Sequence, residues 1–156
     1  MKIEEFTQQD FENLYANAKP IWYNTYSGII PFKQFDFLTN KYFSLEGINY
    51  YKGLGYRYFK ISEEKQIGFL VIKEYEEEVY LDKIYFDLSF QGKGYFKEII
   101  KFIEKFNKPI ILNVNQKNLH AIKAYQKNGF EIILEEVIQL PNNMVNIDYK
   151  MKRSIH

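Results

Sequence analysis

The sequence contains no cysteine and only four prolines. The lack of cysteine excludes disulfides, thiolate-bound metals and a cysteine nucleophile. The first residues, MKIEEFTQQDF, have neither the apolar core nor the small-residue cleavage site of a signal peptide, and no apolar run approaches the length that spans a membrane. We therefore expect a cytoplasmic protein that does not bind membranes.

An excess of charge of either sign is also absent. Twenty-one Lys and Arg residues stand against twenty Asp and Glu residues, for a formal net charge of +1. Such a balance supplies no field to attract nucleic acid, so small molecules are the expected partners. The two histidines, His120 and His156, have no metal-ligand spacing, and we expect no metal site.

The chain has the size and composition of one globular domain, which we expect to cover residues 1–156. Apolar residues make up 46% of it and charged residues 26%. Its fourteen Tyr and fourteen Phe residues are numerous. An aromatic-rich core explains most of them, and an aromatic ligand groove is the alternative for the others.

The first third of the chain is predicted to be mostly helical. A short strand over residues 2–6 precedes Thr7 and Asp10, which have the spacing of a capping box at the start of a helix. Pro20 is expected to break or re-aim this helix, leaving residues 21–31 as a second short helical piece or a loop. Pro31 then suits the start of a helix through residue 43.

From residue 56 the apolar pattern changes to the period of strands. Three runs separated by polar turns predict an antiparallel meander over residues 56–61, 66–75 and 79–87. An amphipathic helix follows, then a short apolar run at 110–114 typical of a buried parallel strand, a helix over 118–129, and a hairpin of 130–140 with 144–153. The predicted class is α+β, with a mixed, mostly antiparallel central sheet and flanking helices.

The junction between the third meander strand and the amphipathic helix reads FQGKGYF, residues 90–96. A glycine turn that opens a helix presents unpaired backbone N–H groups and the positive end of the helix dipole, which suit a phosphate or pyrophosphate. Lys93 adds a positive charge beside it. The alternative is a tight turn without a ligand, and the P-loop and dinucleotide fingerprints are both absent.

Two motifs resemble those of the GNAT acetyltransferase superfamily, and the resemblance spans nearly the whole chain. The family's acyl-CoA signature, Gln/Arg-x-x-Gly-x-Gly/Ala, is matched by residues 91–96, except that Phe96 stands where Gly or Ala is usual. The pattern Asn-x-x-Ala-x-x-x-Tyr-x-x-x-Gly-Phe is matched completely. Its residues are Asn118, Ala121, Tyr125, Gly129 and Phe130. The resemblance implies the acyl-CoA N-acyltransferase fold.

The resemblance also implies acetyl-CoA as the cofactor and assigns residues to it. The glycine turn would cradle the pyrophosphate, and the preceding strand would pair with the pantetheine amides as an added strand does. Asn115 and Asn118 would contact the cofactor arm from the other side. Phe96 would either hold the helix start further from the pyrophosphate or turn its ring into the core. The implied turn residues are Gln91, Gly92, Lys93, Gly94, Tyr95 and Phe96, and the implied strand residues are Ile84, Tyr85 and Phe86.

The implied reaction is direct transfer of an acetyl group to an amine. Tyr125 matches the family tyrosine that donates a proton to the leaving thiolate, and the alternative is a core tyrosine. The family position nearest to a general base is occupied by Tyr80 or Asp82, and Asp82 is the expected base. By the period of two, it shares a strand face with Tyr80, Ile84 and Phe86, while Lys83 lies on the other face. The alternatives are an exposed carboxylate paired with a neighbouring Lys, or an amine that needs no protein base.

The family fold lines the acceptor side with its N-terminal helices. An aromatic acceptor groove would form there from Trp22, Tyr23, Tyr26 and Phe32, and the alternative is a hydrophobic clasp between two helices. The implied function is N-acetylation of a primary amine on a small molecule or peptide, with polyamine-like acceptors favoured. Two alternatives are an inactive acyl-CoA-binding module and an acetyltransferase that acts on a protein partner. Dimers are common in the family, so a homodimer is a further expectation.

Overall fold

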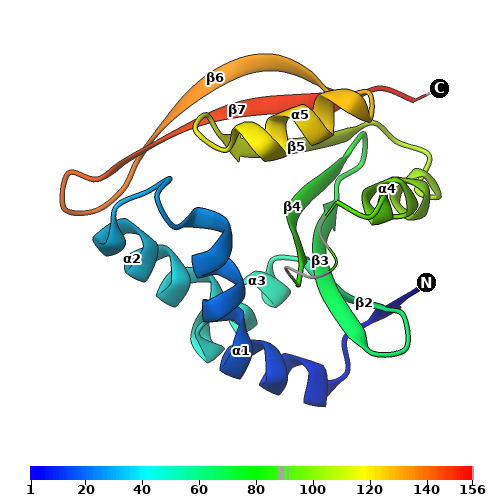
Figure 1. The fold of residues 1–156 in the computed structure, drawn as a ribbon, viewed down its shortest axis with the longest axis horizontal. Coiled ribbons are helices and arrows are strands. Elements are labelled where there is room, and N and C mark those ends of the chain that lie inside the picture. Colours follow the sequence, from blue (N-terminus) through cyan, green and yellow to red (C-terminus); the bar gives the residue numbers. More distant parts are fainter. Residues whose placement is uncertain (88–89, 91, 156) are drawn as a thin grey trace. The chain divides into compact units, whose positions relative to one another are not determined.

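The computed structural model describes residues 1–87, 90 and 92–155, and within residues 18–26 it describes only the Tyr23 side chain. Two compact units make up the chain. The first contains Met1–Glu74 and Asp82–Tyr95, and the second contains Tyr75–Leu81 and Phe96–His156. Figure 1 shows the elements of both units in chain order.

The first unit is built on antiparallel strands. Strand β1 (Lys2–Glu5) pairs with β2 (Arg57–Ser62), and β2 pairs with β3 (Gln66–Glu74). Strand β4 (Val79–Phe86) follows β3 in the hydrogen-bonded order, and its residues from Asp82 onward belong to this unit. The predicted meander is thus confirmed within two residues at each strand end.

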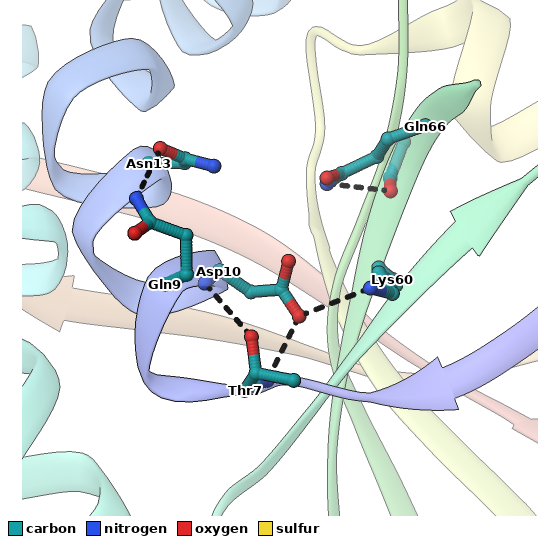
Figure 2. A network of polar contacts seen from close by, with 7 residues as sticks. Thr7, Gln9, Asp10, Asn13, Lys60 and Gln66 are labelled. Atoms are coloured by element: carbon teal, nitrogen blue, oxygen red, sulfur yellow. Dashed lines mark hydrogen bonds and ion pairs between the residues drawn. The ribbon is translucent and has the colours of Figure 1, made fainter.

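Helix α1 (Gln8–Tyr26) begins at the predicted capping box. The hydroxyl of Thr7 accepts from the Asp10 N–H at 3.2 Å, and the Asp10 carboxylate accepts from the Thr7 N–H at 2.8 Å. Lys60 of β2 forms an ion pair with the same carboxylate at 3.3 Å. Figure 2 shows Asp10 between Thr7 and Lys60, so this one side chain caps the helix and ties it to the sheet.

The prediction that Pro20 breaks the first helix is wrong. Helix α1 continues through Pro20 to Tyr26 as one element. A proline removes one N–H from the helix and crowds the carbonyl four residues before it, which can kink a helix without ending it. Helix α2 (Phe32–Phe43) follows Pro31 as predicted. Helix α3 (Leu45–Gly53) was not predicted as a separate element, and it begins where the Ser44 hydroxyl accepts from the Gly47 N–H.

The second unit contains the parallel part of the sheet. The start of β4 runs parallel to β5 (Ile110–Asn115), with Val79 opposite Ile110 and Tyr80 opposite Ile111. Strand β5 pairs antiparallel with β7 (Val145–Arg153), which pairs antiparallel with β6 (Glu131–Gln139). The described strands follow the order β1-β2-β3-β4-β5-β7-β6, so the predicted mixed, mostly antiparallel sheet is confirmed.

Two helices complete the second unit. Helix α4 (Tyr95–Glu104), of which all but the first residue belongs to this unit, carries the predicted apolar face. Helix α5 (Leu119–Lys127) begins at Asn118 and is followed by Gly129 in the left-handed region, as predicted. Burial of each large aliphatic side chain contributes about 2 kcal/mol to folding. The buried residues of this unit include Ile99, Ile100, Ile103, Leu112, Ile122 and Met151.

Candidate functional site

Strand β4 alternates between buried and half-buried residues from Val79 to Phe86, as its period requires. Lys83 lies on the buried side, and its side chain is only 6% exposed. Asp82, on the opposite side by the period, is half-buried, and its carboxylate forms an ion pair with the Lys83 ammonium. Asp82, the expected general base, is therefore paired with a neighbouring lysine, as the first alternative proposed. Its carboxylate is half-buried, whereas that alternative expected an exposed one.

Aromatic rings surround the buried ammonium of Lys83. Its Nζ lies 4.1 Å from the ring centroid of Tyr42 and 5.6 Å from that of Tyr51. The Phe43 ring centroid lies at 5.9 Å. Ammonium groups within about 6 Å of an aromatic face are attracted by the ring quadrupole. The sequence reasoning missed this cluster, although a lysine on the buried face of a strand was the signal for it.

The Asp82 carboxylate also acts on the tyrosines around it. Burial, the neighbouring Tyr51 and the charge of Asp82 raise the pKa of Tyr42, which shares a hydrogen bond with Tyr51. Burial and Asp82 likewise raise the pKa of Tyr51 and of Tyr58. These phenols therefore stay neutral near pH 7, and none of them is a base there. The Asp82–Lys83 pair and its tyrosines all lie in the first unit.

The glycine turn has exposed backbone in a left-handed conformation. Gly92 and Gly94 have φ angles of +75° and +81°, in the left-handed region that favours glycine. A Cβ placed on either residue would meet no atom within 4 Å, so the backbone of the turn is open on that side. Helix α4 begins directly afterwards at Tyr95. Exposed backbone at the positive end of a helix fits a pyrophosphate. Gln91 lies outside the described residues.

Aromatic side chains flank the glycine turn within the first unit. The ring of Tyr95 stacks on Phe86 with centroids 6.0 Å apart, and Phe90 lies 6.3 Å from the same ring. The ammonium of Lys93 is 5.5 Å from the Phe90 ring, and the residue itself is exposed. Two of the implied cofactor residues, Phe86 and Tyr95, are thus brought together. The other implied strand residues, Ile84 and Tyr85, are half-buried and buried.

The asparagines of the second unit are engaged in local contacts. Asn118 caps α5, accepting from the Ala121 N–H at 3.3 Å. Asn115 donates to the Asn146 side chain at 2.9 Å and accepts from the Lys117 N–H at 2.9 Å. These bonds give both residues a structural role in shaping the end of β5 and the start of α5.

Tyr125 lies in an aromatic cluster with the residue that departs from the acyl-CoA signature. Its ring centroid is 5.3 Å from that of Phe96, in an edge-to-face arrangement, and 5.6 Å from that of Phe130. The Phe96 ring also lies 6.5 Å from Phe130. Two positions of the Phe96 ring were expected. These contacts within the second unit agree with the one in which the ring turns into the core. The contacts hold the half-buried Tyr125 ring in one orientation.

A buried carboxylate in the second unit was missed by the sequence reasoning. Asp148 of β7 is 8% exposed, and burial raises its pKa to about 6, with a further rise from Glu136 and an opposing hydrogen bond with Asn113. Glu136 lies directly opposite Asp148 on β6. Only the pairing register of β5, β6 and β7 brings these polar residues together, so the linear sequence gave no signal for the cluster.

The structure describes two side chains of the expected acceptor groove, Tyr23 and Phe32. Phe32 is 69% exposed, and its ring lies 6.3 Å from that of Phe35. Tyr23 is 49% exposed, and its ring lies edge-on to Phe35 of α2 at 5.5 Å. This contact between α1 and α2 agrees with the alternative of a clasp between helices. The side chains of Trp22 and Tyr26 lie outside the described residues. Among the helices that the structure describes, none is both long and apolar enough to cross a bilayer.

Comparisons with known proteins agree on one family. A sequence model of the acetyltransferase (GNAT) family matches residues 11–130. The spermine/spermidine N(1)-acetyltransferase of Bacillus subtilis (strain 168) is 34% identical in an alignment of 97 residues that covers 53% of this chain and 61% of that protein. The chain thus covers about three fifths of the length of this curated relative.

Solved structures share the fold over nearly the full chain. The PaiA N-acetyltransferase from Thermoplasma acidophilum, in complex with coenzyme A, superposes with a TM-score of 0.73 at 20% identity, covering 98% of both chains. A GCN5-related N-acetyltransferase from Rhodopseudomonas palustris gives a TM-score of 0.76 at 11% identity, covering 98% of this chain and 94% of that one. The predicted acyl-CoA N-acyltransferase fold is confirmed.

Proposed function

The chain belongs to the acetyltransferase (GNAT) family, and from this premise we propose that it transfers the acetyl group of acetyl-CoA to a primary amine, with polyamine-like acceptors favoured. The observation that carries the proposal is the glycine turn, where Gly92 and Gly94 leave open backbone at the start of α4. The acceptor class is supported by the B. subtilis relative, which is a spermine/spermidine N(1)-acetyltransferase.

The proposed cofactor residues fall into two groups. Backbone N–H groups of the turn and of the first turn of α4 would hold the pyrophosphate, with Lys93 as a cation beside it. Backbone of β4 would pair with the pantetheine amides, and Asn115 and Asn118 would contact the arm. The turn residues are Gln91, Gly92, Lys93, Gly94, Tyr95 and Phe96, and the strand residues are Ile84, Tyr85 and Phe86.

The proposed step forms a carbon–nitrogen bond and breaks a carbon–sulfur bond. The neutral amine attacks the thioester carbonyl, loses a proton to Asp82 or to water, and expels the thiolate, which takes a proton from the Tyr125 hydroxyl. The edge contact with Phe96 supports this role because it fixes the Tyr125 ring. Tyr23, with Trp22 and Tyr26, would line the acceptor side.

A thiol-release assay tests the proposal directly. Acetyl-CoA is offered with polyamines, amino acids, aminoglycosides and peptide N-termini, and released CoA is detected with a thiol reagent. The chain has no cysteine and therefore gives no background. We expect release that depends on a polyamine. No release with any acceptor, in samples where CoA binding is demonstrated, would contradict the transferase proposal.

A second candidate is an acyl-CoA-binding module without transferase activity. The ion pair of Asp82 with Lys83 favours it, because the carboxylate that would take the proton of the amine is already engaged by an ammonium. The same thiol assay separates the two functions. Binding without turnover would identify the module, provided that peptide and protein acceptors have also been tried.

The proposal also includes the domain organisation, the cellular location and the oligomeric state of the protein. We propose that both compact units form one acetyltransferase domain, which the family match over residues 11–130 supports because it includes parts of both. We also propose a cytoplasmic location. The net charge of +1 accords with the absence of a nucleic-acid partner. A homodimer is supported by exposed apolar residues on β6, the last strand of the sheet order. They are Ile132, Ile133, Leu134 and Val137.

A further inference from the structure

Lys83 is an unusual residue to find in the interior of the first unit. Lysine is almost never fully buried unless its charge is paired. Here the side chain is 6% exposed, and three rings lie within 6 Å of its Nζ. The carboxylate of Asp82 completes the surroundings by an ion pair. We call Tyr42, Phe43, Tyr51 and Asp82 the ammonium cage.

The ammonium cage has the components with which proteins recognise organic cations. Aromatic faces attract an ammonium without the large desolvation cost of a second buried charge, and one carboxylate supplies the countercharge. Tyr42 and Tyr51 share a hydrogen bond, which keeps their rings in a fixed arrangement. Both tyrosines are half-buried, and the Asp82 side chain is 16% exposed, so solvent reaches the edge of the cage.

We propose that the ammonium cage is a binding site for a primary alkylammonium group, and that the Lys83 side chain is its resident occupant. The cage accommodates a straight alkyl chain that ends in an ammonium, because the lysine side chain has this chemistry. The inference rests on the proposed function and deepens it: it names the cage as the place where the ammonium end of a polyamine-like acceptor binds Asp82, in exchange with Lys83, before that end gives up its proton to the carboxylate or to water.

The tether of Lys83 gives it a high effective concentration at the cage, so a free amine competes at a disadvantage in the native chain. Truncation of the occupant removes this competition. The Lys83→Ala variant removes the last three carbons and the ammonium of the side chain, which together correspond to an n-propylammonium ion. The cage is then empty, and the Asp82 carboxylate has lost its partner. A buried charge without a partner is strongly destabilising, so an ion that refills the site stabilises the folded state.

The test is chemical rescue of Lys83→Ala, measured as the unfolding temperature with n-propylammonium chloride, with 1-propanol and with sodium chloride at equal concentration. We expect n-propylammonium to raise Tm by about 4 °C at roughly ten times its Kd, and the two controls to have no such effect. Equal shifts with n-propylammonium and 1-propanol, or no shift with either, would overturn the proposal.

Two further variants make the test specific. Lys83→Met retains a long side chain and leaves no room in the cage, so n-propylammonium should not raise its Tm beyond the salt control. The double variant Asp82→Asn with Lys83→Ala lacks the countercharge, and its rescue should be lost. An undiminished ammonium effect in either variant would place the binding elsewhere and overturn the proposal.

The outcome remains decisive if Lys83→Ala is unfolded by itself. In that case far-UV circular dichroism follows the chain as each additive is introduced, and recovery of the native spectrum in n-propylammonium alone supports the cage. No recovery in either additive overturns it. Acetyl-CoA takes no part in these measurements. If rescue fails while acetyl transfer is intact, the result contradicts only the cage proposal. If rescue succeeds but no acetyl transfer occurs, the result contradicts only the enzymatic proposal.

Discussion

The carboxylate of Asp82 and the ammonium of Lys83, consecutive residues of β4, form an ion pair at the edge of an aromatic cluster. A base in such a pair needs its partner to move or a water to relay the proton. We predict that Asp82→Asn lowers kcat for an amine acceptor by about 10- to 100-fold, while the Kd of CoA changes less than twofold.

The matched control is Glu76→Gln, which neutralises an exposed carboxylate in the turn between β3 and β4. It should leave both constants unchanged. If Asp82→Asn also retains the native kcat at every pH from 6 to 9, the amine loses its proton without this carboxylate, and Asp82 serves only as the partner of Lys83.

Tyr125→Phe removes the hydroxyl and keeps the ring, so the effect of the hydroxyl can be measured by itself. Because the ring contacts with Phe96 and Phe130 are retained, the unfolding temperature should change by less than about 2 °C. We predict that kcat falls by at least about tenfold and that the Kd of CoA stays within twofold. Steady-state kinetics and calorimetric binding measure the two effects. Unchanged kcat would assign Tyr125 a purely structural role.

Local signals in the sequence predicted most elements of the fold. The Thr7 and Asp10 spacing located the start of α1, and Gly129 of the second motif located the end of α5, because caps are encoded by neighbouring residues. Pro20 misled the prediction, since its intrinsic penalty is local whereas the length of α1 depends on hydrogen bonds along the whole helix.

The candidate site was predictable only where it is contiguous in sequence. The glycine turn was identified because its function lies in backbone conformation at Gly92 and Gly94. The ammonium cage was not, because Tyr42 and Tyr51 lie in two helices far from Lys83 in the chain. Likewise, Asp148 and Glu136 meet only through strand register, which cannot be read from either strand alone.

Gly68 of β3 is required by a close backbone approach. A Cβ at this position would lie 2.1 Å from the carbonyl oxygen of Tyr85 in β4, a distance that no adjustment of a flexible side chain can relieve. We predict that Gly68→Ala destabilises the protein by about 3 kcal/mol or more, through displacement of one strand. Gly53→Ala, whose Cβ would meet no atom within 4 Å, should be neutral or slightly stabilising in the same denaturation experiment.

Asp10 links the stability of the first unit to acid pH. Burial opposes its ionisation, but hydrogen bonds from Thr7 and the ion pair with Lys60 outweigh burial, so the pKa of Asp10 is lowered from 3.8. A lowered folded-state pKa contributes stability above the unfolded value that is lost as the pH falls through the folded value. We predict that Asp10→Asn reduces stability by about 1 kcal/mol at pH 7. The difference from the native chain should shrink below pH 4 in chemical denaturation curves, and a constant difference would contradict the assigned pKa.

Asp148 changes stability with pH in the opposite direction to Asp10. Burial and Glu136 raise its pKa from 3.8 to about 6, so between these values the folded state holds a proton that the unfolded state has lost. The contribution of Asp148 to stability therefore falls as the pH rises from about 4 to about 6, and its full cost remains above that range.

We predict that Asp148→Asn is more stable relative to the native chain at pH 7 than at pH 4 by about 2 kcal/mol. Denaturant unfolding of both proteins at the two pH values measures this difference, and Glu135→Gln, at an exposed position of β6, is the control. Parallel pH profiles for Asp148→Asn and the native chain would show that this carboxylate is solvated in the folded protein.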